Sequence, residues 1–517
     1  MDGVAQPVGT AQGVIVVGAG IGGLTAAVTL AGAGVPVTLI EADAVTGGKL
    51  RAVPSDAGPV DCGPTVLTKR HVFDALFSRL GLRLDDHVTL HRADTVARHW
   101  WPDGAALDLT SDAGANETAV RAALGSRAAL DYARFEAETQ AMHDAFAAPV
   151  MHAPRPSAAG ILAATLRRPA LIPALLKPNL AAYLNARFCD PRLRQLFGRY
   201  ATYVGGAPNA SPAVLALIWQ AERAGVWTVE GGLSALAAAL TQVAERLGAT
   251  VLTGAPVAEV LRNGPRAAGV RLASGLELRA PHVVFAGDPA ALLPKGDVTG
   301  AARAIRRNAT HPRSLSANVW SFAAAVEGPV LAHHTVLFAD SPNSEFEDIA
   351  RGRLPRDPSF YICAQDRPVD PATGPAPLER FEIIANAAST DVHTQTPQET
   401  AQCHRKMLTR LASFGLTLSP EPTVADLATP HRFAARYPGS HGAIYGRSPH
   451  GVTASFRRPT AETRVPGLWL AGGGTHPGAG VPMAALSGMH AAEAILRVQT
   501  STLRSRRTAM PGGTSTA

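Results

Sequence analysis

The sequence Gly18-Ala-Gly-Ile-Gly-Gly23 restricts the fold of this chain more than any other feature. It directly follows an apolar, β-branched run over 14–17, which is typical of a buried parallel strand. Residues 24–31 then predict a helix, and residues 37–40 predict a second strand that ends at Glu41. Strand, glycine turn, helix, strand and terminal acid form the βαβ unit that binds a dinucleotide. We therefore expect an α/β fold with a doubly wound parallel sheet.

Each residue of this motif has a physical role in that geometry. Gly18 makes the tight turn, and Gly20 lets a pyrophosphate reach the N-terminus of the helix. Gly22 completes the glycine motif, and Gly23 lets the helix pack closely on the strand. Glu41 is expected to accept hydrogen bonds from the adenosine ribose. The alternative is a glycine-rich turn without a ligand, which the flanking strands and helix disfavour.

The residues after Glu41 distinguish between the possible dinucleotides. Gly47, Gly48 and Lys49 place a second glycine pair and a cation directly beyond this acid. The segment resembles the extension found in flavoproteins of the amine oxidase and phytoene desaturase kind, which NAD dehydrogenases usually lack. The resemblance implies FAD, with the glycine pair beside its ribityl–pyrophosphate arm and Lys49 or Arg51 offsetting its charge. We expect the FAD to be non-covalent, because no His or Cys stands in a recognisable attachment motif.

A second glycine-rich loop, 472–480, stands near the other end of the sequence. It follows a short apolar strand over 468–471 and precedes a helix with proline in its first turn. The two glycine loops would hold the two ends of one long cofactor, with this helix N-terminus facing the flavin ring. His476 is the candidate catalytic residue beside that ring, or else it hydrogen-bonds backbone within the loop. The other residues expected at the flavin are Gly473, Gly474, Val481 and Pro482.

Composition excludes several other classes of protein. With 46% apolar and 17% charged residues, the chain is typical of a globular protein. Its four cysteines are far apart and form no CxxC pair, so we expect no metal site and four reduced thiols in the cytoplasm. No basic residue precedes Lys49, which disfavours a secretory signal. The uncharged stretch 13–40 contains seven glycines, and we interpret it as a soluble βαβ unit rather than a membrane span.

Further motifs allow a resemblance to a family to be stated. They are GAGIGGLTAA, GGKLR, DCGPTVLT, YVGGAPNASPAVLALI, GVWTVEGGLSALAAAL, HHTVLFADSPNSEF, SFYICAQDR and GGGTHPGAGVPMAALSG. In this order, over roughly 13–497, they resemble bacterial carotenoid desaturases of the phytoene desaturase family. The branch most similar is that of hydroxycarotenoid 3,4-desaturase, also called methoxyneurosporene dehydrogenase.

The resemblance implies an FAD-dependent oxidoreductase of carotenoid biosynthesis. It would introduce a C3–C4 double bond into an acyclic 1-hydroxycarotenoid by hydride transfer to the flavin, with oxygen or a quinone as the final electron acceptor. Val257 would meet the adenine through its backbone. One departure concerns the ribityl chain: many flavoproteins carry an acid after the C-terminal strand, where this sequence has Gly473, Gly474 and Thr475. Backbone amides would take the place of that acid.

A basic segment interrupts the α/β pattern. Residues 161–200 contain seven basic residues and one acid, separated by leucine, isoleucine and proline. This pattern is typical of a surface that lies on an anionic membrane, and a forty-carbon polyene would have to enter the protein from a bilayer. Few aromatic residues accompany the charges, so nucleic acid is disfavoured. We therefore expect a cytoplasmic, peripherally membrane-associated protein whose membrane-facing residues include Arg167, Arg168, Lys177 and Arg187.

These observations divide the chain into consecutive segments. The fold expected is an FAD-binding parallel sheet, an antiparallel-sheet substrate domain and a helical membrane-facing cap. The segments are a disordered N-terminus (1–12), a first FAD-binding part (13–110), the helical cap (111–220), a second FAD-binding part with a β-meander (221–290), the substrate domain (291–440), a third FAD-binding part (441–498) and a disordered tail (499–517).

Other functions remain open at this point. The same fold is compatible with phytoene desaturation or with a flavin-dependent carotenoid isomerisation. An amine oxidase would require an aromatic cage near the flavin, and the sequence shows no clear one. A non-catalytic lipid-binding protein of the Rab GDP-dissociation-inhibitor type keeps the fold without flavin chemistry, and the two intact glycine loops disfavour it.

Overall fold

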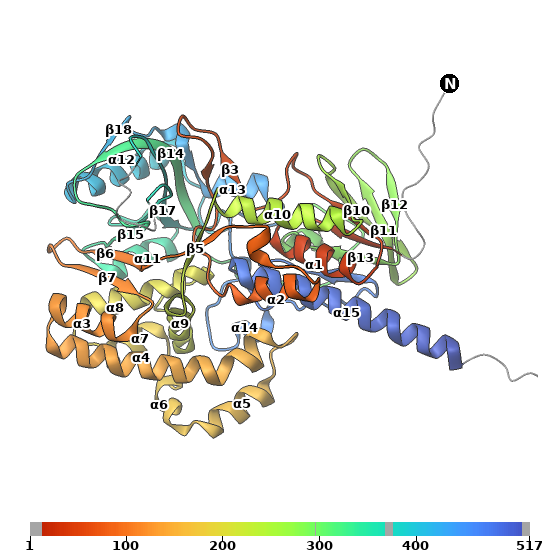
Figure 1. Cartoon of the computed structure of the whole chain (residues 1–517), viewed down its shortest axis with the longest axis horizontal. Helices are drawn as coiled ribbons and strands as arrows, with labels where there is room; N and C mark the ends of the chain where they lie inside the picture. Colours follow the sequence, from red (N-terminus) through yellow and green to blue (C-terminus); the bar gives the residue numbers. More distant parts are fainter. Residues whose placement is uncertain (1–12, 295, 368–375, 509–517) are drawn as a thin grey trace, which may run out of the picture.

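The computed structural model describes residues 13–294, 296–367 and 376–508. Two sheets lie side by side, and a helical unit lies against the second of them (Figure 1). The predicted disorder of 1–12 and 509–517 lies outside the described residues. The prediction for the rest of the tail is wrong, because helix α15 (Val481–Thr508) continues through it. No proline stands between Pro482 and Pro511 to end the helix earlier.

The first sheet is the parallel sheet that the glycine motif predicts. Its strand order is β20–β13–β1–β2–β9, and every pairing is parallel. The central strand β1 is aligned with both neighbours so that Val17 lies opposite Ile40 and Phe285. The carboxyl ends of these strands therefore meet at one edge, where ligands bind in open α/β sheets. The strands are β1 (Val14–Val17), β2 (Val37–Ile40), β9 (Thr250–Leu252), β13 (His282–Phe285) and β20 (Leu468–Leu470).

The two faces of this sheet are covered by different structures. Val14 and Val16 pack with the helices of one face, whereas Ile15 and Val17 pack against a three-stranded antiparallel meander on the other. The sheet is thus not doubly wound as predicted, because short strands rather than helices bury its second face. The helices are α1 (Ile21–Gly32), α2 (His71–Arg79), α10 (Leu233–Arg246) and α15; the meander is β10 (Val257–Asn263), β11 (Arg266–Leu272) and β12 (Glu277–Arg279).

The second sheet has eight strands and is mostly antiparallel. Its antiparallel pairings confirm the antiparallel sheet predicted within 291–440. The strands and the helix of this segment that form it are β14 (Ser316–Glu327), β15 (His334–Leu337), β16 (Phe360–Ala364), β17 (Glu379–Ala387), β18 (Thr417–Ser419), β19 (Leu427–Ala428) and α12 (Pro397–Ser413). The remaining strands, β6 (Thr95–Trp100) and β7 (Ala106–Thr110), fall within the segment 13–110 that we assigned to FAD binding. That boundary is wrong for them, since β6 pairs in parallel with β15.

A helical unit covers one side of the second sheet. It is built around a cluster of buried aromatic rings that includes Phe135, Phe188 and Phe197, with centroids 4.3–5.3 Å apart. Its helices are α3 (Ala113–Leu124), α4 (Ser126–Phe146), α5 (Ala158–Arg167), α6 (Ile172–Leu175), α7 (Leu180–Arg187), α8 (Pro191–Gly198) and α9 (Trp219–Arg223). Within the described ranges, no single helix has the length and apolarity to cross a membrane. The pair Ala158–Arg167 and Pro169–Leu175 has both only when taken together, and it is bent by 101°.

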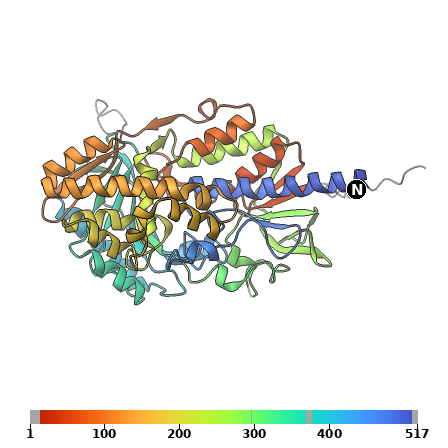
Figure 2. The same cartoon turned by 90° about the horizontal axis from the view of Figure 1, so that it is seen from below.

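The first and last helices of the fold cross in direct contact. Gly488 of α15 lies so close to α1 that a Cβ there would stand 2.1 Å from the carbonyl oxygen of Gly22. The Thr25 hydroxyl of α1 donates a hydrogen bond of 3.0 Å to the carbonyl of Ala485. From this crossing α15 runs along the molecule and projects from its body (Figures 1 and 2). The contact places the N-terminal ends of both helices beside each other at the edge of the parallel sheet.

Candidate functional site

A continuous cavity of about 1690 Å³ begins at the two glycine loops and extends between the second sheet and the helical unit. A drug-sized ligand occupies a pocket of roughly 300–1,000 Å³, so this cavity has room for two elongated molecules. The site residues from the sequence that line it are Gly18, Gly20, Gly22, Glu41, Gly47, Gly48, Lys49, Val257, Gly473, Gly474, Val481 and Pro482.

The glycines of the first loop differ in what a side chain would meet. Gly18 has φ +96°, which favours glycine, and a Cβ on Gly23 would stand 1.9 Å from the Gly18 carbonyl oxygen. A Cβ on Gly22 would stand 2.4 Å from the Gly472 amide of the second loop. At Gly20, by contrast, the nearest atom would be 3.9 Å away, on Gly48. Gly22 and Gly23 are therefore required by the fold, while Gly20 keeps open the space in front of helix α1.

Glu41 is fixed at the end of β2 by backbone amides. One carboxylate oxygen accepts a hydrogen bond of 2.7 Å from the Ala19 amide, and the other accepts one of 3.0 Å from the Asp43 amide. The side chain is buried yet lines the cavity. Each oxygen of a carboxylate has a second lone pair, so Glu41 can still accept from a ribose. Val257 lines the same end of the cavity at the start of β10.

The second loop is supported from behind by Arg458. Its guanidinium donates to the carbonyls of Gly473 (2.7 Å) and Tyr445 (3.2 Å), and burial lowers its pKa to about 10. The Gly472 amide donates to the Ser487 hydroxyl of α15 at 2.7 Å. These contacts leave the Gly473–Gly474 backbone on the cavity wall, directly before the N-terminus of α15. The partial positive charge of that terminus is a favourable environment for an anion.

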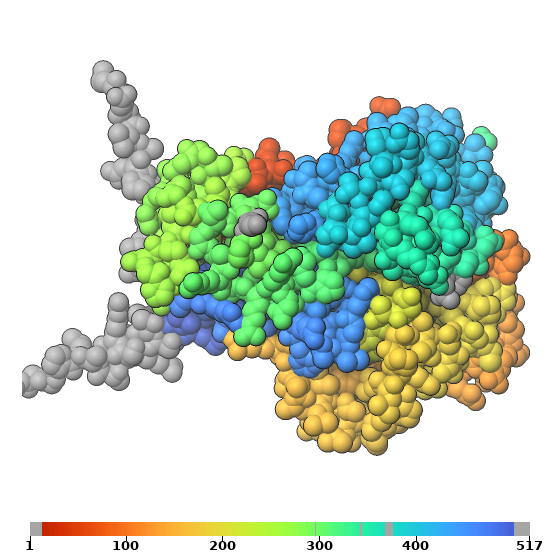
Figure 3. All heavy atoms as spheres, turned by 180° about the vertical axis from the view of Figure 1, so that it is seen from behind, coloured from red at the N-terminus to blue at the C-terminus, as the bar shows by residue number. Residues whose placement is uncertain are grey.

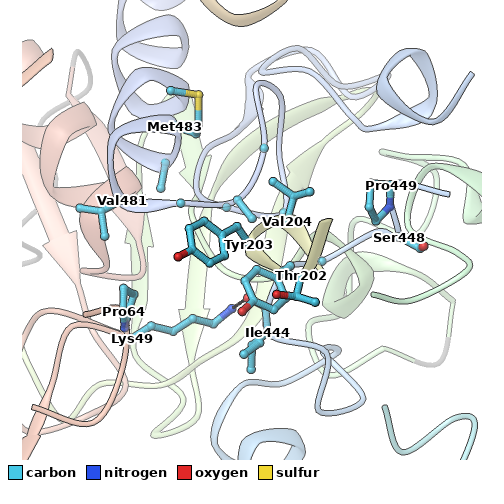
Figure 4. Close-up of a pocket in the computed structure, with 18 of the residues that line it drawn as sticks. Lys49, Pro64, Thr202, Tyr203, Val204, Ile444, Ser448, Pro449, Val481 and Met483 are labelled. Carbon is cyan, nitrogen blue, oxygen red and sulfur yellow. Dashed lines mark hydrogen bonds between the residues drawn. The ribbon is translucent and has the colours of Figure 1, made fainter. Parts of the chain in front are cut away.

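Lys49 extends across the cavity from the first glycine extension (Figure 4). Its ammonium donates a hydrogen bond of 2.5 Å to the Ile444 carbonyl and lies 5.3 Å from the centre of the Tyr437 ring. The pKa of Lys49 is lowered to about 8, mainly by burial and in part by the cations of Arg313 and Arg458, against the opposing effect of Asp288. Lys49 is therefore a cation held where a negatively charged ligand would relieve the loss of hydration.

Sequence reasoning missed a buried ion pair at the same edge. Asp288 lies three residues after the end of β13, and its carboxylate receives the guanidinium of Arg313, whose side chain is 1% exposed. Arg313 also donates to the Ser440 and Thr310 carbonyls. The signal in the sequence is the Gly287-Asp288 turn, because polar residues at the carboxyl ends of parallel strands belong to ligand sites. The partner, Arg313, has no local signal.

Three predicted site residues do not line the cavity: Gly23, which packs against the Gly18 carbonyl as described above, His476 and Arg51. His476 is buried outside it, and its Nε2 hydrogen-bonds the Ala153 carbonyl at 2.9 Å, while burial lowers its pKa to about 4. The position does not support a catalytic His476, and it also differs from the alternative, because the backbone group that His476 bonds belongs to the helical unit and not to its own loop. Arg51 lies beside Cys62, whose amide donates to the Arg51 carbonyl at 2.9 Å. Its predicted role at the cofactor arm is not supported, since Arg51 is not among the described residues that line the cavity.

The predicted membrane-facing cations have different environments. Arg167 and Arg168 are exposed, and Lys177 is partly exposed. Arg187 is different, because its guanidinium is bound by the Glu138 carboxylate and lies over the Tyr183 ring. We therefore correct its assignment: its charge is neutralised inside the helical unit.

One group of side chains has the atoms to hold a metal ion. His333, His334 and Cys363 bring two imidazoles and a thiol within 4.8 Å of one another. Burial raises the pKa of the thiol well above its usual value and lowers that of His334 well below. All three groups are therefore neutral, and the thiol lies 3.6 Å from His333. Sequence reasoning, which expected no metal site, could not see this group because β15 and β16 bring it together.

A dinucleotide cradle at one end of a cavity and apolar walls at the other define a nucleotide-dependent oxidoreductase. Residues 21–496 match the model of the flavin containing amine oxidoreductases, and the chain belongs to this family. FAD is its cofactor. The site fits this molecule, since Gly20 opens the helix N-terminus to a pyrophosphate, Glu41 has free acceptor positions, and Lys49 and α15 provide positive charge.

Relatives and solved structures agree with this assignment. The chain is 53% identical over 486 residues to "Hydroxyneurosporene desaturase" of Cereibacter sphaeroides, covering 93% of this chain and 97% of that one. It is 50% identical over 487 residues to the protein of that name from Rhodobacter capsulatus, with the same coverage. Among solved structures, an oxidoreductase from Methanosarcina mazei has a TM-score of 0.61 at 17% identity, covering 93% of this chain and 99% of that one. That likeness shows the fold.

Gly20→Val is expected to abolish FAD binding without unfolding the protein. The valine side chain would fill the space that a pyrophosphate needs, but it meets no protein atom closer than 3.9 Å at Cβ. Bound flavin and the unfolding midpoint of the FAD-free protein are the measurements. Gly22→Ala is the matched control: it should lower that midpoint, because its Cβ collides with Gly472. Full flavin content in Gly20→Val would contradict the placement of the pyrophosphate.

FAD affinity is expected to fall as the pH rises above about 8. The pKa of Lys49 is lowered to about 8 in the protein, so the ammonium form that attracts the FAD phosphates is lost above that pH. Loss of one charge-assisted hydrogen bond weakens binding about tenfold or more. Lys49→Met should bind weakly at every pH and show no such step in an equilibrium titration. Lys406→Met is the control, because Lys406 is half-buried and has a lowered pKa but donates to the Pro355 carbonyl away from the cavity.

Proposed function

We propose that the chain is an FAD-dependent desaturase of carotenoid biosynthesis that introduces the C3–C4 double bond of an acyclic 1-hydroxycarotenoid. The observation that carries this proposal is the similarity, over nearly the whole of both chains, to relatives named hydroxyneurosporene desaturase. The cavity supports it independently, because it continues from the FAD cradle into apolar walls of the helical unit and the second sheet. These walls include Phe146, Val150, Met151, Ile161, Leu175, Leu184, Val319, Val336 and Phe338.

The residues of the chain provide binding, orientation and exclusion of water in this reaction. FAD, when bound, supplies the acceptor for the hydride that leaves an allylic C–H. A proton leaves the neighbouring carbon, so that two hydrogens are lost and one C=C bond is formed. The apolar walls hold the extended polyene in one direction, and such positioning accounts for much of a rate enhancement. Lys49 and the N-terminus of α15 favour the negative charge that the two transferred electrons bring into the cavity.

The purified holoprotein is expected to convert a 1-hydroxylated acyclic carotenoid into a product two hydrogens lighter. The product should absorb at longer wavelength, because the new C3–C4 bond extends the conjugation, and mass spectrometry with NMR should place the bond. Gly20→Val, which lacks FAD, is the negative control. An unchanged mass with altered retention would indicate an isomerase, turnover of phytoene alone would indicate an earlier desaturation, and turnover of an amine would contradict the substrate class.

We further propose that the protein attaches to the cytoplasmic face of an anionic membrane through the lobe around α5 (Figure 3). Three large apolar side chains are exposed there, Leu162 (59%), Leu166 (66%) and Leu176 (77%). The cations Arg167, Arg168 and Lys177 alternate with them in the sequence. Apolar side chains that enter the acyl boundary beside cations that meet anionic headgroups are typical of interfacial attachment. Val452 and Phe456, also exposed, line the cavity together with Ile161 of α5.

Reversing Arg167, Arg168 and Lys177 to Glu is expected to release the protein from anionic liposomes. Each cation near such a surface contributes about 1 kcal/mol, so the triple reversal should weaken binding by well over a hundredfold at low salt. Sedimentation with liposomes of graded anionic content measures it. The matched control reverses Arg266, Arg303 and Arg306, which are exposed on the meander (β11) and beside the buried cluster that the meander shares. Equal loss of binding in both triple variants would show that net charge, not this lobe, is responsible.

A further inference from the structure

One buried carboxyl group in the cavity has no partner in the protein. Glu382 is 0% exposed and lines the cavity, and neither of its carboxyl oxygens has a hydrogen-bond partner. Removing such a group from water without a partner destabilises the folded protein, so its presence needs an explanation. Of the described residues that line the cavity, Glu382 and Arg199 are the two whose buried side-chain atoms lack partners.

The position of Glu382 follows from the alternation of strand β17. Phe381, Ile383 and Ala385 point into the core under α12, so Glu382, Ile384 and Asn386 point to the opposite face and line the cavity. The Asn386 side chain has a hydrogen-bond partner, since its amide donates a hydrogen bond of 2.8 Å to the Glu345 carboxylate. Ile384 is apolar. Glu382 is thus the polar position of this strand that remains open to a ligand.

The protonation state of Glu382 determines which ligand suits it. Burial raises the pKa of this carboxyl well above its usual value, and the nearby Asp61 raises it further. Glu382 is therefore a neutral carboxylic acid at physiological pH, with one O–H donor and a carbonyl acceptor. An alcohol has the same pair of functions, one donor and one acceptor. Arg199 offers donors only, and its guanidinium lies over the Tyr203 ring at 4.9 Å.

Glu382 also lies at the end of the cavity near FAD. It is close enough to contribute, after burial, to the raised pKa values of Cys62 and Tyr445. Cys62 belongs to the turn that follows the first glycine extension, and Tyr445 accepts from Arg458, which supports the second loop. In a 1-hydroxycarotenoid the oxygen of the C1 hydroxyl is only three bonds from C3, one of the reacting carbons. A group that binds this hydroxyl must therefore lie beside the flavin end, as Glu382 does.

We propose that Glu382 binds the C1 hydroxyl of the carotenoid and so sets both the choice of substrate and the position of the new double bond. This inference rests on the proposed function. The carboxyl group donates to and accepts from the hydroxyl, which satisfies its otherwise unpartnered atoms. A polyene without the hydroxyl leaves them unpaired, and a site built to hydrogen-bond a hydroxyl rejects such an analogue strongly. Glu382 acts on specificity and positioning and takes no proton from the reacting carbons.

The test compares a 1-hydroxylated carotenoid with the same polyene lacking the hydroxyl, in wild type and four variants of the FAD-loaded protein. Glu382→Leu should lower the ratio of kcat/KM for the hydroxylated over the unsubstituted polyene by about tenfold or more, mainly through loss on the hydroxylated one. Glu382→Gln should keep most of the ratio, since an amide also donates and accepts. Ile384→Leu, on the same face of β17, should leave the ratio unchanged, as should Arg199→Met.

A second readout does not depend on turnover. The carboxylic acid C=O band of Glu382, identified by its loss in Glu382→Gln, should shift in infrared difference spectra when the hydroxylated polyene is added, and not with the unsubstituted one. An unchanged substrate ratio in Glu382→Leu would overturn the inference, as would loss of the ratio in Arg199→Met alone. A flavin spectrum altered in Glu382→Leu without carotenoid would assign Glu382 to the cofactor instead.

The proposed function and this inference fail differently. A shifted carboxyl band without C3–C4 desaturation would disprove the function and leave the hydroxyl contact standing. Desaturation with an unshifted band and an unchanged ratio would keep the function and disprove the role of Glu382. If the protein shows no turnover and the carboxyl band does not shift, both the proposed function and the role of Glu382 are disproved.

Discussion

The contact between helices α1 and α15 is the constraint on which the rest of the structure depends. Gly22 meets Gly472 and Gly488 at distances that admit no side chain, and the Thr25 hydroxyl ties α1 to the Ala485 carbonyl. Residues separated by about 460 positions in the sequence thereby become neighbours. Because both helices begin at the same edge of the parallel sheet, their N-termini form one positively polarised surface for a dinucleotide. The small residues at this crossing contribute to cofactor binding indirectly, because they determine the distance between the two glycine loops.

Long-range hydrogen bonds extend this arrangement into the cavity. The Asp61 carboxylate accepts from the Ser234 hydroxyl at 2.7 Å and from the Leu233 amide, and so caps helix α10. The backbone of Asp61 exchanges two hydrogen bonds with the Gln365 amide beyond strand β16. One residue thus links the cofactor turn at 62–65, a helix under the parallel sheet and the second sheet. The substrate cavity is built on a frame that is continuous with the cofactor site.

The sequence predicted those parts of the fold that have local signals. The βαβ unit, the second glycine loop, the start of α15 and strands β14 to β17 each follow from periodicity or from glycine and proline within a short window. The meander that covers the second face of the parallel sheet was predicted as strands. Its position on that face could not be predicted, because no local pattern indicates which face of a sheet a strand covers. The parallel pairing of β6 with β15 joins residues more than 230 positions apart and leaves no local trace.

The candidate site shows the same division. Gly20, Glu41 and Lys49 were predictable because the motif that contains them is contiguous, whereas Arg313 and Arg458 act through partners distant in sequence. His476 shows the opposite error: its neighbours in sequence are loop glycines on the cavity wall, but its side chain turns away to the Ala153 carbonyl. Glu382 had a signal that was not used, since a single acid within the apolar run of β17 must be either paired or reserved for a ligand.

The basic segment 161–200 contains many cations, but most of them are bound by other groups of the protein. The number of cations in a segment therefore does not show where a membrane-binding surface lies. Arg187 is paired with Glu138, Arg192 is paired with Asp190, and Arg194 and Arg199 line the cavity, which leaves Arg167, Arg168 and Lys177 for the membrane attachment proposed above. Helix α5 presents Ile161 to the cavity and Leu162 to the outside. Moving a forty-carbon polyene into water costs on the order of 30 kcal/mol at about 0.8 kcal/mol per CH₂-sized group. If the attachment proposed above holds, the apolar wall of α5 would have one face toward lipid and one toward the cavity, and such a molecule could pass without crossing water.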